Sequence, residues 1–191
     1  RVLFDEYESN VIEKTDTLIL HVGPTPFTTE SYAYREEVFS SIAREHKCPV
    51  IALNHTGANS SIIFDGNTLV FNKKGVLITK GAAFDEDFIL IDTNALENLA
   101  PVKEAARDSI ALIHDALVSG IKDFFRKNGF SKAVLGLSGG IDSALVAALA
   151  VEALGKENVL GILMPSRFST DHSVKDAVDL ARNLGIAHET L

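Results

Sequence analysis

The sequence predicts an α/β protein built in two parts, and three observations support this. In residues 133–191, apolar runs of strand length alternate with helical segments, which is typical of a doubly wound parallel sheet. In the first half, short apolar runs are separated by turn residues, a pattern that favours hairpins. Between the two, residues 93–102 include polar side chains and a proline at position 101, as expected of a linker. We therefore expect one domain in residues 1–97 and another in residues 98–191.

The first part is expected to hold several strands and one long helix. The helix should begin at a capping Thr28 or Thr29 and run to about Lys47. Four apolar side chains fall on one face of it: Tyr34, Val38, Phe39 and Ile42. Turn chemistry at residues 65–67 and 72–75 predicts hairpins between neighbouring strands. The expected strands are residues 17–22, 49–54, 61–64, 68–71, 76–78 and 88–91.

The second part alternates in type along its length. Residues 103–127 show helical periodicity and end at Asn128-Gly129, a helix stop signal. After them we expect strands at residues 133–137 and 159–163, helices at residues 141–154 and 170–184, and a terminal strand. The chain begins with Arg1 in an apolar strand and ends where another strand starts, so it is expected to be a fragment.

Composition excludes several classes of protein. The 191 residues are 46% hydrophobic and 23% charged, with a net charge of -8, which argues against general nucleic-acid binding. The single cysteine, Cys48, allows no internal disulfide. No apolar stretch reaches the roughly 18 residues of a membrane helix, and the N-terminus lacks a signal peptide. A cytoplasmic protein without a membrane partner is expected.

A glycine pair at a strand-to-helix junction predicts an anion site. The run is Gly136, Leu137, Ser138, Gly139, Gly140, Ile141, Asp142 and Ser143. Glycines let a ligand approach the main chain, and the following helix N-terminus favours a negative charge. Asp142 would repel phosphates unless Mg2+ bridges the two, so it is the predicted metal ligand.

Two other phosphate loops are excluded by the same residues. No lysine follows the glycines, as Gly-x-x-x-x-Gly-Lys-Ser/Thr requires, and the spacing is not Gly-x-Gly-x-x-Gly. The alternative is a glycine-rich turn that serves only the packing of strand on helix.

Residues 138–143 resemble the signature of the ATP pyrophosphatases, which cleave ATP between its α and β phosphates. The following segment, Met-Pro-Ser-Arg-Phe-Ser-Thr at residues 164–170, resembles that of glutamine-dependent NAD+ synthetases within this family. Residues 176–186 are also similar. The resemblance implies an adenine-nucleotide α-hydrolase-like domain, with residues 136–143 on ATP and the backbone near Met164 facing the adenine.

The resemblance also implies a reaction and its participants. ATP, deamido-NAD+ and ammonia would give NAD+, AMP and pyrophosphate, with Mg2+ as cofactor and glutamine as the source of ammonia. The enzyme would be a C–N ligase and a homo-oligomer. The deamido-NAD+ site is expected largely beyond residue 191, so this stretch alone is expected to be inactive.

Residues 1–97 resemble the C-terminal portion of a nitrilase-like glutaminase domain. This chemistry needs a cysteine nucleophile, a glutamate base and a lysine. The resemblance implies that the glutamate and lysine lie upstream of Arg1. No cysteine is found at Phe4 or its neighbours, so the nucleophile is expected either to precede Arg1 or to have been replaced. Cys48 is expected to be a buried structural residue instead. The glutamine-binding position of the family falls on Thr25, and a basic position falls on Ser31, which has no charge.

Three other functions remain open at this stage. A sister ATP pyrophosphatase, such as a tRNA-thiolating or GMP synthetase-like enzyme, shares the loop but not the segment after Met164. A non-catalytic nucleotide-binding module would bind ATP without releasing pyrophosphate. A degenerate amidase part that only mediates oligomer contacts is compatible with the missing cysteine.

Overall fold

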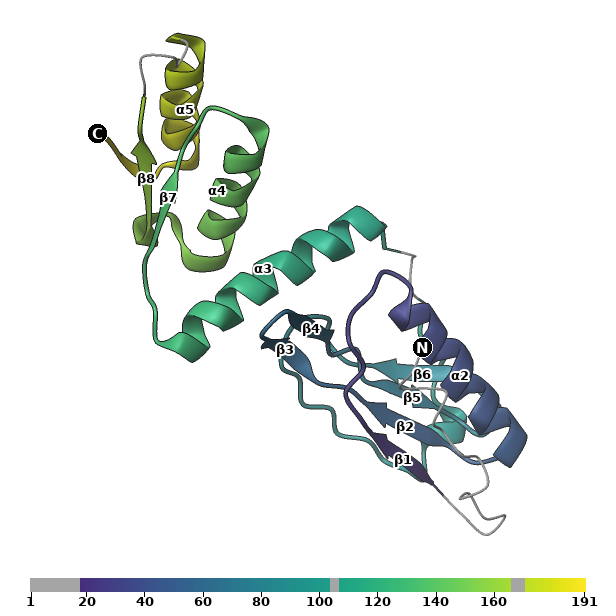
Figure 1. Ribbon diagram of the computed structural model, residues 1–191. Helices are drawn as coiled ribbons and strands as arrows, with labels where there is room; N and C mark the ends of the chain where they lie inside the picture. The colour runs from purple at the N-terminus through teal and green to yellow at the C-terminus, as the bar shows by residue number, and fades with distance from the viewer. Residues whose placement is uncertain (1–17, 104–106, 166–170) are drawn as a thin grey trace. The chain divides into compact units, whose positions relative to one another are not determined.

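The computed structural model describes residues 18–103, 107–165 and 171–191, in two compact units, residues 1–116 and 117–191 (Figure 1). Both units mix helices with strands, and the second contains a parallel sheet, which confirms the predicted α/β class. The units divide within a helix, further along the chain than the expected boundary between residues 97 and 98. The assignment of these stretches to two domain families remains a prediction. The expected strand at Arg1 and residues 166–170 lie outside the described residues.

A four-stranded mixed sheet forms the frame of the first unit. Its strands are β1 (Ile19–Val22), β2 (Val50–Leu53), β5 (Leu69–Phe71) and β6 (Leu77–Lys80), in the order β1-β2-β5-β6. β1 and β2 are parallel, and the other two pairs are antiparallel. Helix α2 (Ser31–His46) packs on one face through Phe39 and Ile42, whose aliphatic and aromatic carbons are buried against Val50, Leu69 and Phe71. Of the face predicted from the sequence, Val38, Phe39 and Ile42 meet the core, whereas Tyr34 is exposed.

The two predicted hairpin turns have different outcomes. Residues 72–75 join the antiparallel strands β5 and β6, and Gly75 has the positive φ of 72° that such a turn needs. Residues 65–67 do not form the predicted hairpin, because β4 (Ile62–Asp65) pairs with β3 (Thr56–Asn59) in a separate two-stranded sheet. Strand β3 has the sequence Thr-Gly-Ala-Asn and gives no apolar alternation for sequence reasoning to find.

Two further predictions in this unit are wrong. Residues 88–91 form no strand, and Phe88 and Leu90 are each 89% exposed. Neither threonine caps α2: the N-cap residue is Glu30, which makes no side-chain cap. Instead, Ser31 Oγ accepts a hydrogen bond from the N–H of Thr28 at 3.1 Å and donates one to the carbonyl of Thr28 at 3.0 Å. The helix therefore starts at Ser31, after both threonines.

The stretch predicted as a linker is attached to the first unit. It contains a short 3-10 helix, Leu96–Asn98, in which Leu96 is fully buried beside Val70 and Ile78. The N–H of Val102 donates to the carbonyl of Leu77 at 2.9 Å. The next helix, α3 (Ser109–Asn128), starts six residues after the predicted residue 103 and ends at the predicted Asn-Gly signal.

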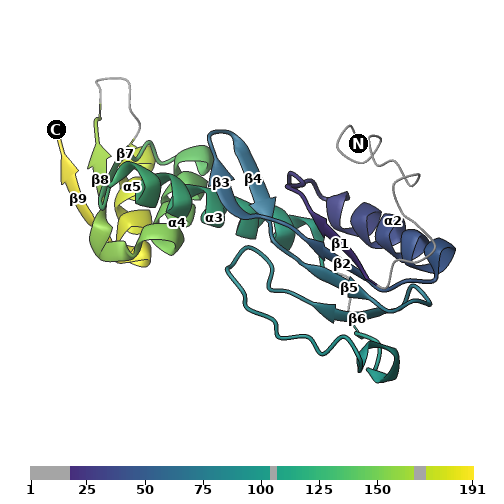
Figure 2. The same ribbon diagram turned by 90° about the horizontal axis from the view of Figure 1, so that it is seen from below.

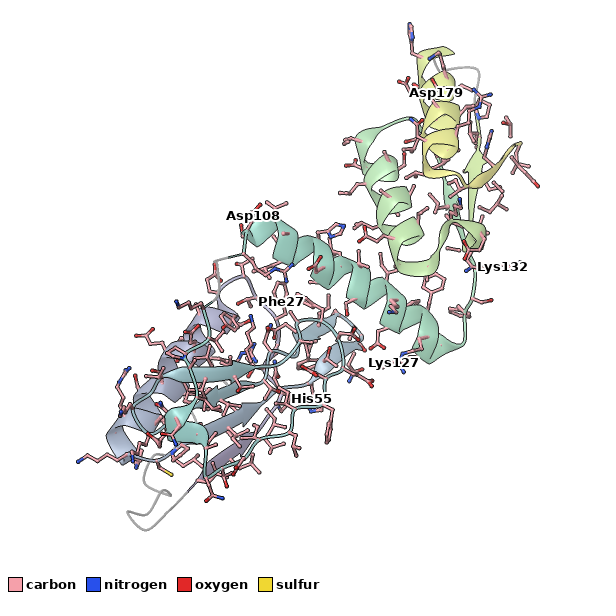
Figure 3. The ribbon with its side chains drawn as sticks, turned by 180° about the vertical axis from the view of Figure 1, so that it is seen from behind. Phe27, His55, Asp108, Lys127, Lys132 and Asp179 are labelled. Carbon is pink, nitrogen blue, oxygen red and sulfur yellow. The ribbon has the colours of Figure 1, made fainter. Side chains whose placement is uncertain are left out.

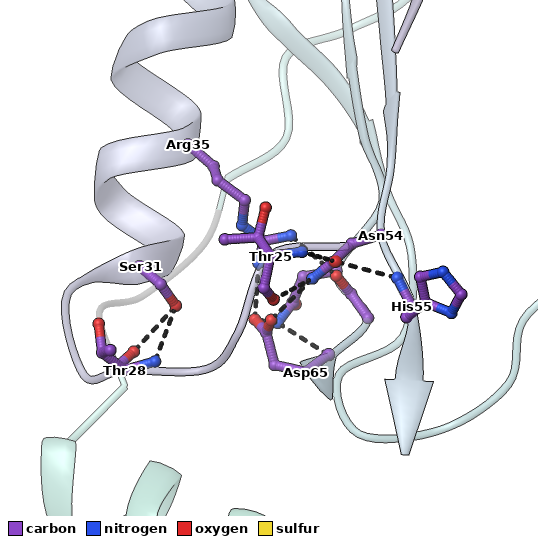
Figure 4. A network of polar contacts seen from close by, with 9 residues as sticks. Thr25, Thr28, Ser31, Arg35, Asn54, His55 and Asp65 are labelled. Atoms are coloured by element: carbon purple, nitrogen blue, oxygen red, sulfur yellow. Dashed lines mark hydrogen bonds and ion pairs between the residues drawn. The ribbon is translucent and has the colours of Figure 1, made fainter. Parts of the chain in front are cut away.

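A polar network ties α2 to the end of β4 and to the loops that follow β2 and β4 (Figure 4). Arg35 donates to Asp65 at 2.7 Å and to the carbonyl of Gly66 at 3.0 Å. Asp65 also accepts from the amide of Asn54 at 3.0 Å and from that of Asn67 at 2.6 Å. Burial lowers the pKa of Arg35, although its pairing with Asp65 acts in the opposite direction. Asp65 is therefore the hub that satisfies three buried donors.

The second unit is a parallel sheet with strands β7 (Ala133–Gly136), β8 (Val159–Leu163) and β9 (Ala187–Thr190), in the order β7-β8-β9 (Figure 2). Helices α4 (Ile141–Leu154) and α5 (Asp171–Leu184) make the two crossovers, and a 3-10 helix, Lys156–Asn158, precedes β8. These elements are found where the sequence predicted them. The predicted start of the last helix at Thr170 lies outside the described residues.

Helices α4 and α5 share one core with one face of this sheet. Val159 and Leu163 of β8 are buried there with Ala147 of α4 and Ala181 of α5. On the opposite face Val134 is 68% exposed. The described residues thus provide the βαβαβ portion of the predicted doubly wound sheet. Within the described ranges, no helix is long and apolar enough to cross a membrane.

We expect Asp65→Leu to destabilise the protein by about 3–5 kcal/mol, because Arg35 would be left as a buried charge without its partner. Chemical denaturation of the full-length protein measures the change. Glu37→Leu, at an exposed position of α2, is the control and should stay within about 0.5 kcal/mol. Equal effects of the two substitutions would contradict a structural role for the network.

The folded protein should become less stable as the pH is lowered below about 6.5, because burial lowers the pKa of His21. Between that lowered pKa and about 6.5, the unfolded chain binds a proton that the folded chain does not, so the free energy of unfolding rises with pH. His21→Phe should reduce this dependence while keeping a ring beside Phe39, whose centroid lies 4.8 Å from that of His21. Denaturation midpoints at pH 5.5 and 8, compared between the two proteins, check the sign.

Candidate functional site

The predicted phosphate loop connects β7 to α4 within a few residues. Leu137 is 5% exposed and continues the strand pairing, because its N–H donates to the carbonyl of Ile162 at 2.8 Å. The chain then leaves the sheet at Ser138, and α4 begins at Ile141 with Gly140 as its N-cap residue. The loop therefore lies at the carboxyl edge of the parallel sheet, where ligands bind in open α/β folds.

The two glycines are needed for different reasons. Gly139 has a φ of +78°, and a Cβ built on it would lie 2.2 Å from the backbone oxygen of Ser173 in α5. No side chain fits there. Gly140 has an ordinary φ of -90°, and the nearest atom to an added Cβ is Ser138 Oγ at 3.4 Å. Of the two glycines, the fold requires only Gly139. Gly140 could carry a side chain without a clash, and its lack of one leaves the main chain accessible to a ligand.

The hydroxyl groups of Ser138 and Ser143 hold the loop together. Ser143 Oγ lies 3.0 Å from Ser138 Oγ and donates to the carbonyl of Gly140 at 3.0 Å. It also accepts the N–H of Ser138 at 3.2 Å, while Ser138 Oγ accepts the N–H of Gly140 at 3.2 Å. All four hydrogen bonds are at the surface, where an incoming group can reach them.

The start of α4 suits an anion. Among the described residues, no side chain caps this helix, so its first-turn amides keep their capacity to donate. The helix dipole adds a partial positive charge at the same place. Ile141 and Asp142 are exposed at this end. The combination of open amides, dipole and hydroxyl groups can hold a phosphate.

Met164 lies at the same edge of the sheet as the loop. It follows β8 directly and is 65% exposed. A Cβ built on Gly136 would lie 3.4 Å from Met164 Cε, so the missing side chain at Gly136 leaves room for the methionine. Strand pairing thus brings the two predicted parts of the site together, Met164 and the loop. The remainder of the predicted segment, residues 166–170, lies outside the described residues.

Asp142, the predicted metal ligand, lies exposed in the first turn of α4. In the part of the chain that the structure describes, no group of three or more His, Cys, Asp or Glu side chains could hold a metal ion. Mg2+ is usually bound by one or two carboxylates together with substrate phosphates and water. An exposed Asp142 in the first turn of α4 fits that arrangement and does not fit a permanent metal centre.

A cavity of about 410 Å³ adjoins the loop from the side of α4 and α5. Asp176 and Asp179 line it together with Gly139 and Gly140. Asp179, labelled in Figure 3, accepts a hydrogen bond from Lys175 at 2.7 Å. The carboxylates of Asp176 and Asp179 disfavour an anion at this wall. Phosphate is therefore expected at the other end of the cavity, which Gly140 and Ile141 line.

In the first unit, Thr25 is buried and held through its backbone. Its N–H donates to Asn54 Oδ1 at 2.7 Å, and its carbonyl accepts from Asn54 Nδ2 at 3.3 Å (Figure 4). Ser31, at the position where the family has a basic residue, is also buried. Cys48 is 2% exposed and not in a disulfide, in agreement with the structural role predicted for it.

Sequence reasoning missed two features. It did not identify the contact of Gly139 with Ser173, because the glycine and the α5 backbone are distant in the chain. It also did not identify Arg35 and Asp65 as partners, since a charged residue in a helix normally indicates a solvated face. A buried ion pair has no local sequence signal.

The chain is similar to NAD synthases and to glutamine-dependent NAD+ synthetases. Residues 113–191 match the family model of NAD synthase. A glutamine-dependent NAD+ synthetase of Synechocystis is 43% identical over 95% of this chain and 33% of its own length. Another, of Aquifex aeolicus, is 38% identical over 88% of this chain and 36% of its own length. The chain spans about a third of the curated relatives that it matches.

Solved structures agree with this result. The glutamine-dependent NAD+ synthetase of Acinetobacter baumannii, in complex with ADP, has a TM-score of 0.82 at 31% identity, over 91% of this chain and 34% of that one. The Cytophaga hutchinsonii enzyme, at 20% identity and a TM-score of 0.81 over 93% of this chain and 36% of that one, supports the fold alone. Residues 113–191 are therefore similar to the NAD synthases, in a chain that is similar over most of its length to the glutamine-dependent NAD+ synthetases.

Proposed function

We propose that the protein to which this chain belongs is a ligase that forms a C–N bond. It converts deamido-NAD+ to NAD+ with consumption of ATP and release of AMP and pyrophosphate. The observation that carries the proposal is the strand-loop-helix junction at residues 136–143, with a fold-required glycine, a second open glycine and an uncapped helix. It lies within the segment that matches NAD synthase.

ATP is assigned to the carboxyl edge of the β7-β8-β9 sheet. The amides at Gly140 and in the first turn of α4 would hold its phosphates, with the hydroxyl groups of Ser138 and Ser143 beside them. The backbone after Met164 would face the adenine. The solved relative from Acinetobacter baumannii was obtained with ADP, a nucleotide with the same adenosine and α- and β-phosphates, which supports this assignment.

The chemistry proposed for this site is adenylation followed by amide formation. A carboxylate oxygen of deamido-NAD+ attacks the α-phosphorus of ATP, and the bond from that phosphorus to pyrophosphate breaks. Ammonia then attacks the activated carbonyl carbon, AMP leaves, and ammonia loses a proton. The main contribution of the loop is electrostatic, since its fixed N–H groups face the negative charge that develops on the leaving pyrophosphate.

Mg2+ is assigned to Asp142 together with the phosphates. When bound, Mg2+ would neutralise phosphate charge and so assist departure of the pyrophosphate. The carboxylate of Asp142 would fix the position of the ion next to the loop. Without a cation, the same carboxylate would repel the nucleotide.

Glutamine is the proposed source of ammonia, and residues 1–97 are assigned to a nitrilase-like glutaminase domain. Similarity to glutamine-dependent enzymes over 95% of the chain supports this. Thr25 occupies the glutamine-binding position of that family, and its rigid backbone suits a fixed contact. Ser31 supplies no charge for the glutamine carboxylate. Rates with glutamine and with ammonium chloride, measured on the full-length protein, decide between the two nitrogen sources.

The test of the main proposal is release of pyrophosphate from ATP by full-length protein. Release should require deamido-NAD+, and NAD+ should accumulate in equal amount when ammonia is present. ATP binding without any pyrophosphate would indicate a non-catalytic nucleotide-binding module. Pyrophosphate release with tRNA or xanthosine monophosphate in place of deamido-NAD+ would indicate a sister ATP pyrophosphatase.

Gly140→Val should abolish ATP binding and leave the fold intact. Its backbone angles suit any residue, and the contact of an added Cβ with Ser138 Oγ is an ordinary one, but the side chain would block approach to the amides. Isothermal titration with ATP and a thermal melt of the full-length protein give both quantities. Gly139→Ala is the contrasting variant, expected to lose stability because its Cβ meets the Ser173 carbonyl. A Gly140→Val protein with wild-type ATP affinity would refute the site.

Asp142→Asn should reduce the ammonia-dependent rate by orders of magnitude and weaken its dependence on Mg2+. The change keeps the shape of an exposed side chain, so stability should stay within about 0.5 kcal/mol. Favourable interaction of the carboxylate with the helix dipole is only about 0.3–1 kcal/mol. Steady-state rates across a series of Mg2+ concentrations provide the measurement. An unchanged rate and Mg2+ response would show that Asp142 is structural.

A further inference from the structure

Thr25 lies at the carboxyl edge of the two parallel strands of the first unit. β1 and β2 run in the same direction and end at Val22 and Leu53, which are paired with each other, so the segments after them leave the sheet at one edge. Asn54 follows β2 directly, and its side chain meets Thr25 in the segment after β1 (Figure 4). In open α/β sheets, this edge of the parallel strands is where ligands bind.

The main chain around Thr25 offers few groups that could anchor it. Pro24 and Pro26 have no N–H, so Thr25 carries the only one in this three-residue run. The proline that follows also favours extended backbone angles at Thr25. Asn54 binds both polar groups of this residue's main chain: Oδ1 accepts the N–H at 2.7 Å, and Nδ2 donates to the carbonyl at 3.3 Å. A single side chain thus sets the position of Thr25.

The amide of Asn54 can be oriented in only one way. A carboxylate accepts hydrogen bonds and donates none, so Asp65 Oδ1, at 3.0 Å, requires Nδ2 of Asn54 on its side. Oδ1 of Asn54 then faces the N–H groups of Thr25 and His55, at 2.7 and 2.9 Å. Asp65 is itself held by Arg35 at 2.7 Å. The direction of all the hydrogen bonds of Asn54 is therefore set by a carboxylate that is fixed in place.

The side chain of Thr25 takes no part in this arrangement. Thr25 is 6% exposed, and both of its hydrogen bonds with Asn54 involve its main chain. Within the described ranges, no protein group makes a hydrogen bond with the hydroxyl of Thr25. A hydroxyl has one proton to donate and two lone pairs, so this one keeps its full capacity for a ligand.

We propose that Asn54 is a positioning residue for glutamine, which holds the main chain of Thr25 so that the hydroxyl of Thr25 faces the substrate. The inference rests on the glutaminase function proposed above, and in it Asn54 does not touch glutamine. A contact group that is fixed before binding loses little freedom when the substrate arrives, which favours affinity. Without Asn54, Thr25 would keep its hydroxyl but lose its fixed position.

The test is a double-mutant cycle in full-length protein, with the KM for glutamine as the readout. Thr25→Val removes the hydroxyl and keeps the shape of the side chain and the main-chain bonds to Asn54. Asn54→Ser leaves a side chain too short to reach both main-chain groups of Thr25. Each single variant is expected to raise the KM about tenfold, the factor typical of one neutral hydrogen bond, with little change in kcat. The double variant should also show about a tenfold rise, because Asn54 acts through Thr25.

The rate with ammonium chloride is the internal reference, since ammonia bypasses the hydrolysis of glutamine. This rate should be unchanged in all three variants. Asn54 belongs to the polar network around Asp65, so the melting temperature of Asn54→Ser is expected to fall, and all rates are measured well below it. Asn59→Ser makes the same chemical change at an exposed position of β3. It is the matched control and should alter neither rate.

Several results would overturn the proposal. A rise of about a hundredfold in the double variant, the product of two independent effects, would show that Asn54 does not act through Thr25. Parallel loss of the glutamine- and ammonia-dependent rates in Asn54→Ser would assign Asn54 to fold stability alone. A wild-type KM for glutamine in Thr25→Val would overturn the proposal whatever the stability of Asn54→Ser, because Thr25→Val keeps the hydrogen bonds of the network.

Failure of the proposed glutaminase function gives a different result. A wild-type protein that uses ammonia but not glutamine would refute that function, and the positioning role with it, before any variant is made. A wild-type protein that uses glutamine, together with an Asn54→Ser protein of unchanged KM, would overturn the positioning role alone.

Discussion

A close approach between Gly139 and the backbone of α5 anchors the phosphate loop to the rest of the second unit. An added Cβ at Gly139 would lie 2.2 Å from the Ser173 carbonyl oxygen, so the loop and the first turns of α5 touch through their main chains. Flexible side chains could adjust to such a crowded contact, but two backbones cannot. Because α4 begins directly after the loop, the direction of its N-terminus is fixed by the same contact. The α5 helix thus supports the site from outside it.

The neighbouring glycine shows which part of the loop is free for a ligand. Gly140 has ordinary backbone angles and open space for a side chain, so neither folding nor packing explains a glycine there. The proposed close approach of a ligand to the main chain would explain it. In the structure, packing therefore requires a glycine at 139 but not at 140, and the role proposed for Gly140 is to leave the main chain open to a ligand. The alternative of a purely structural turn accounts only for Gly139.

Prediction from the sequence succeeded where the local pattern and the tertiary contacts agree. Helix α4 and strand β8 have the predicted limits, because strand and helix periodicities alternate there without interruption. It failed where tertiary contacts decide the outcome. Residues 88–91 are apolar but form no strand, and Thr-Gly-Ala-Asn forms β3 only because β4 pairs with it. The loop was predictable as a sequence motif. Its contact with Ser173 and the hydrogen bonds of Ser138 and Ser143 were not predictable, because they depend on the three-dimensional structure.

The polar network around Asp65 and the hydrogen-bonded loop around Gly140 differ in how completely their donors and acceptors are paired inside the protein. Around Asp65, carboxylate, guanidinium and amide groups bind one another in the interior, and Thr25 is held there by Asn54. Replacement of any partner leaves a buried charge or amide, so this network resists change and stabilises the fold. Around Gly140, the partners are neutral hydroxyl groups at the surface, beside a helix end with open amides. Exchange of those partners for phosphate oxygens costs little and gains charge-assisted bonds. Polar satisfaction therefore distinguishes a structural cluster from a site prepared for a ligand.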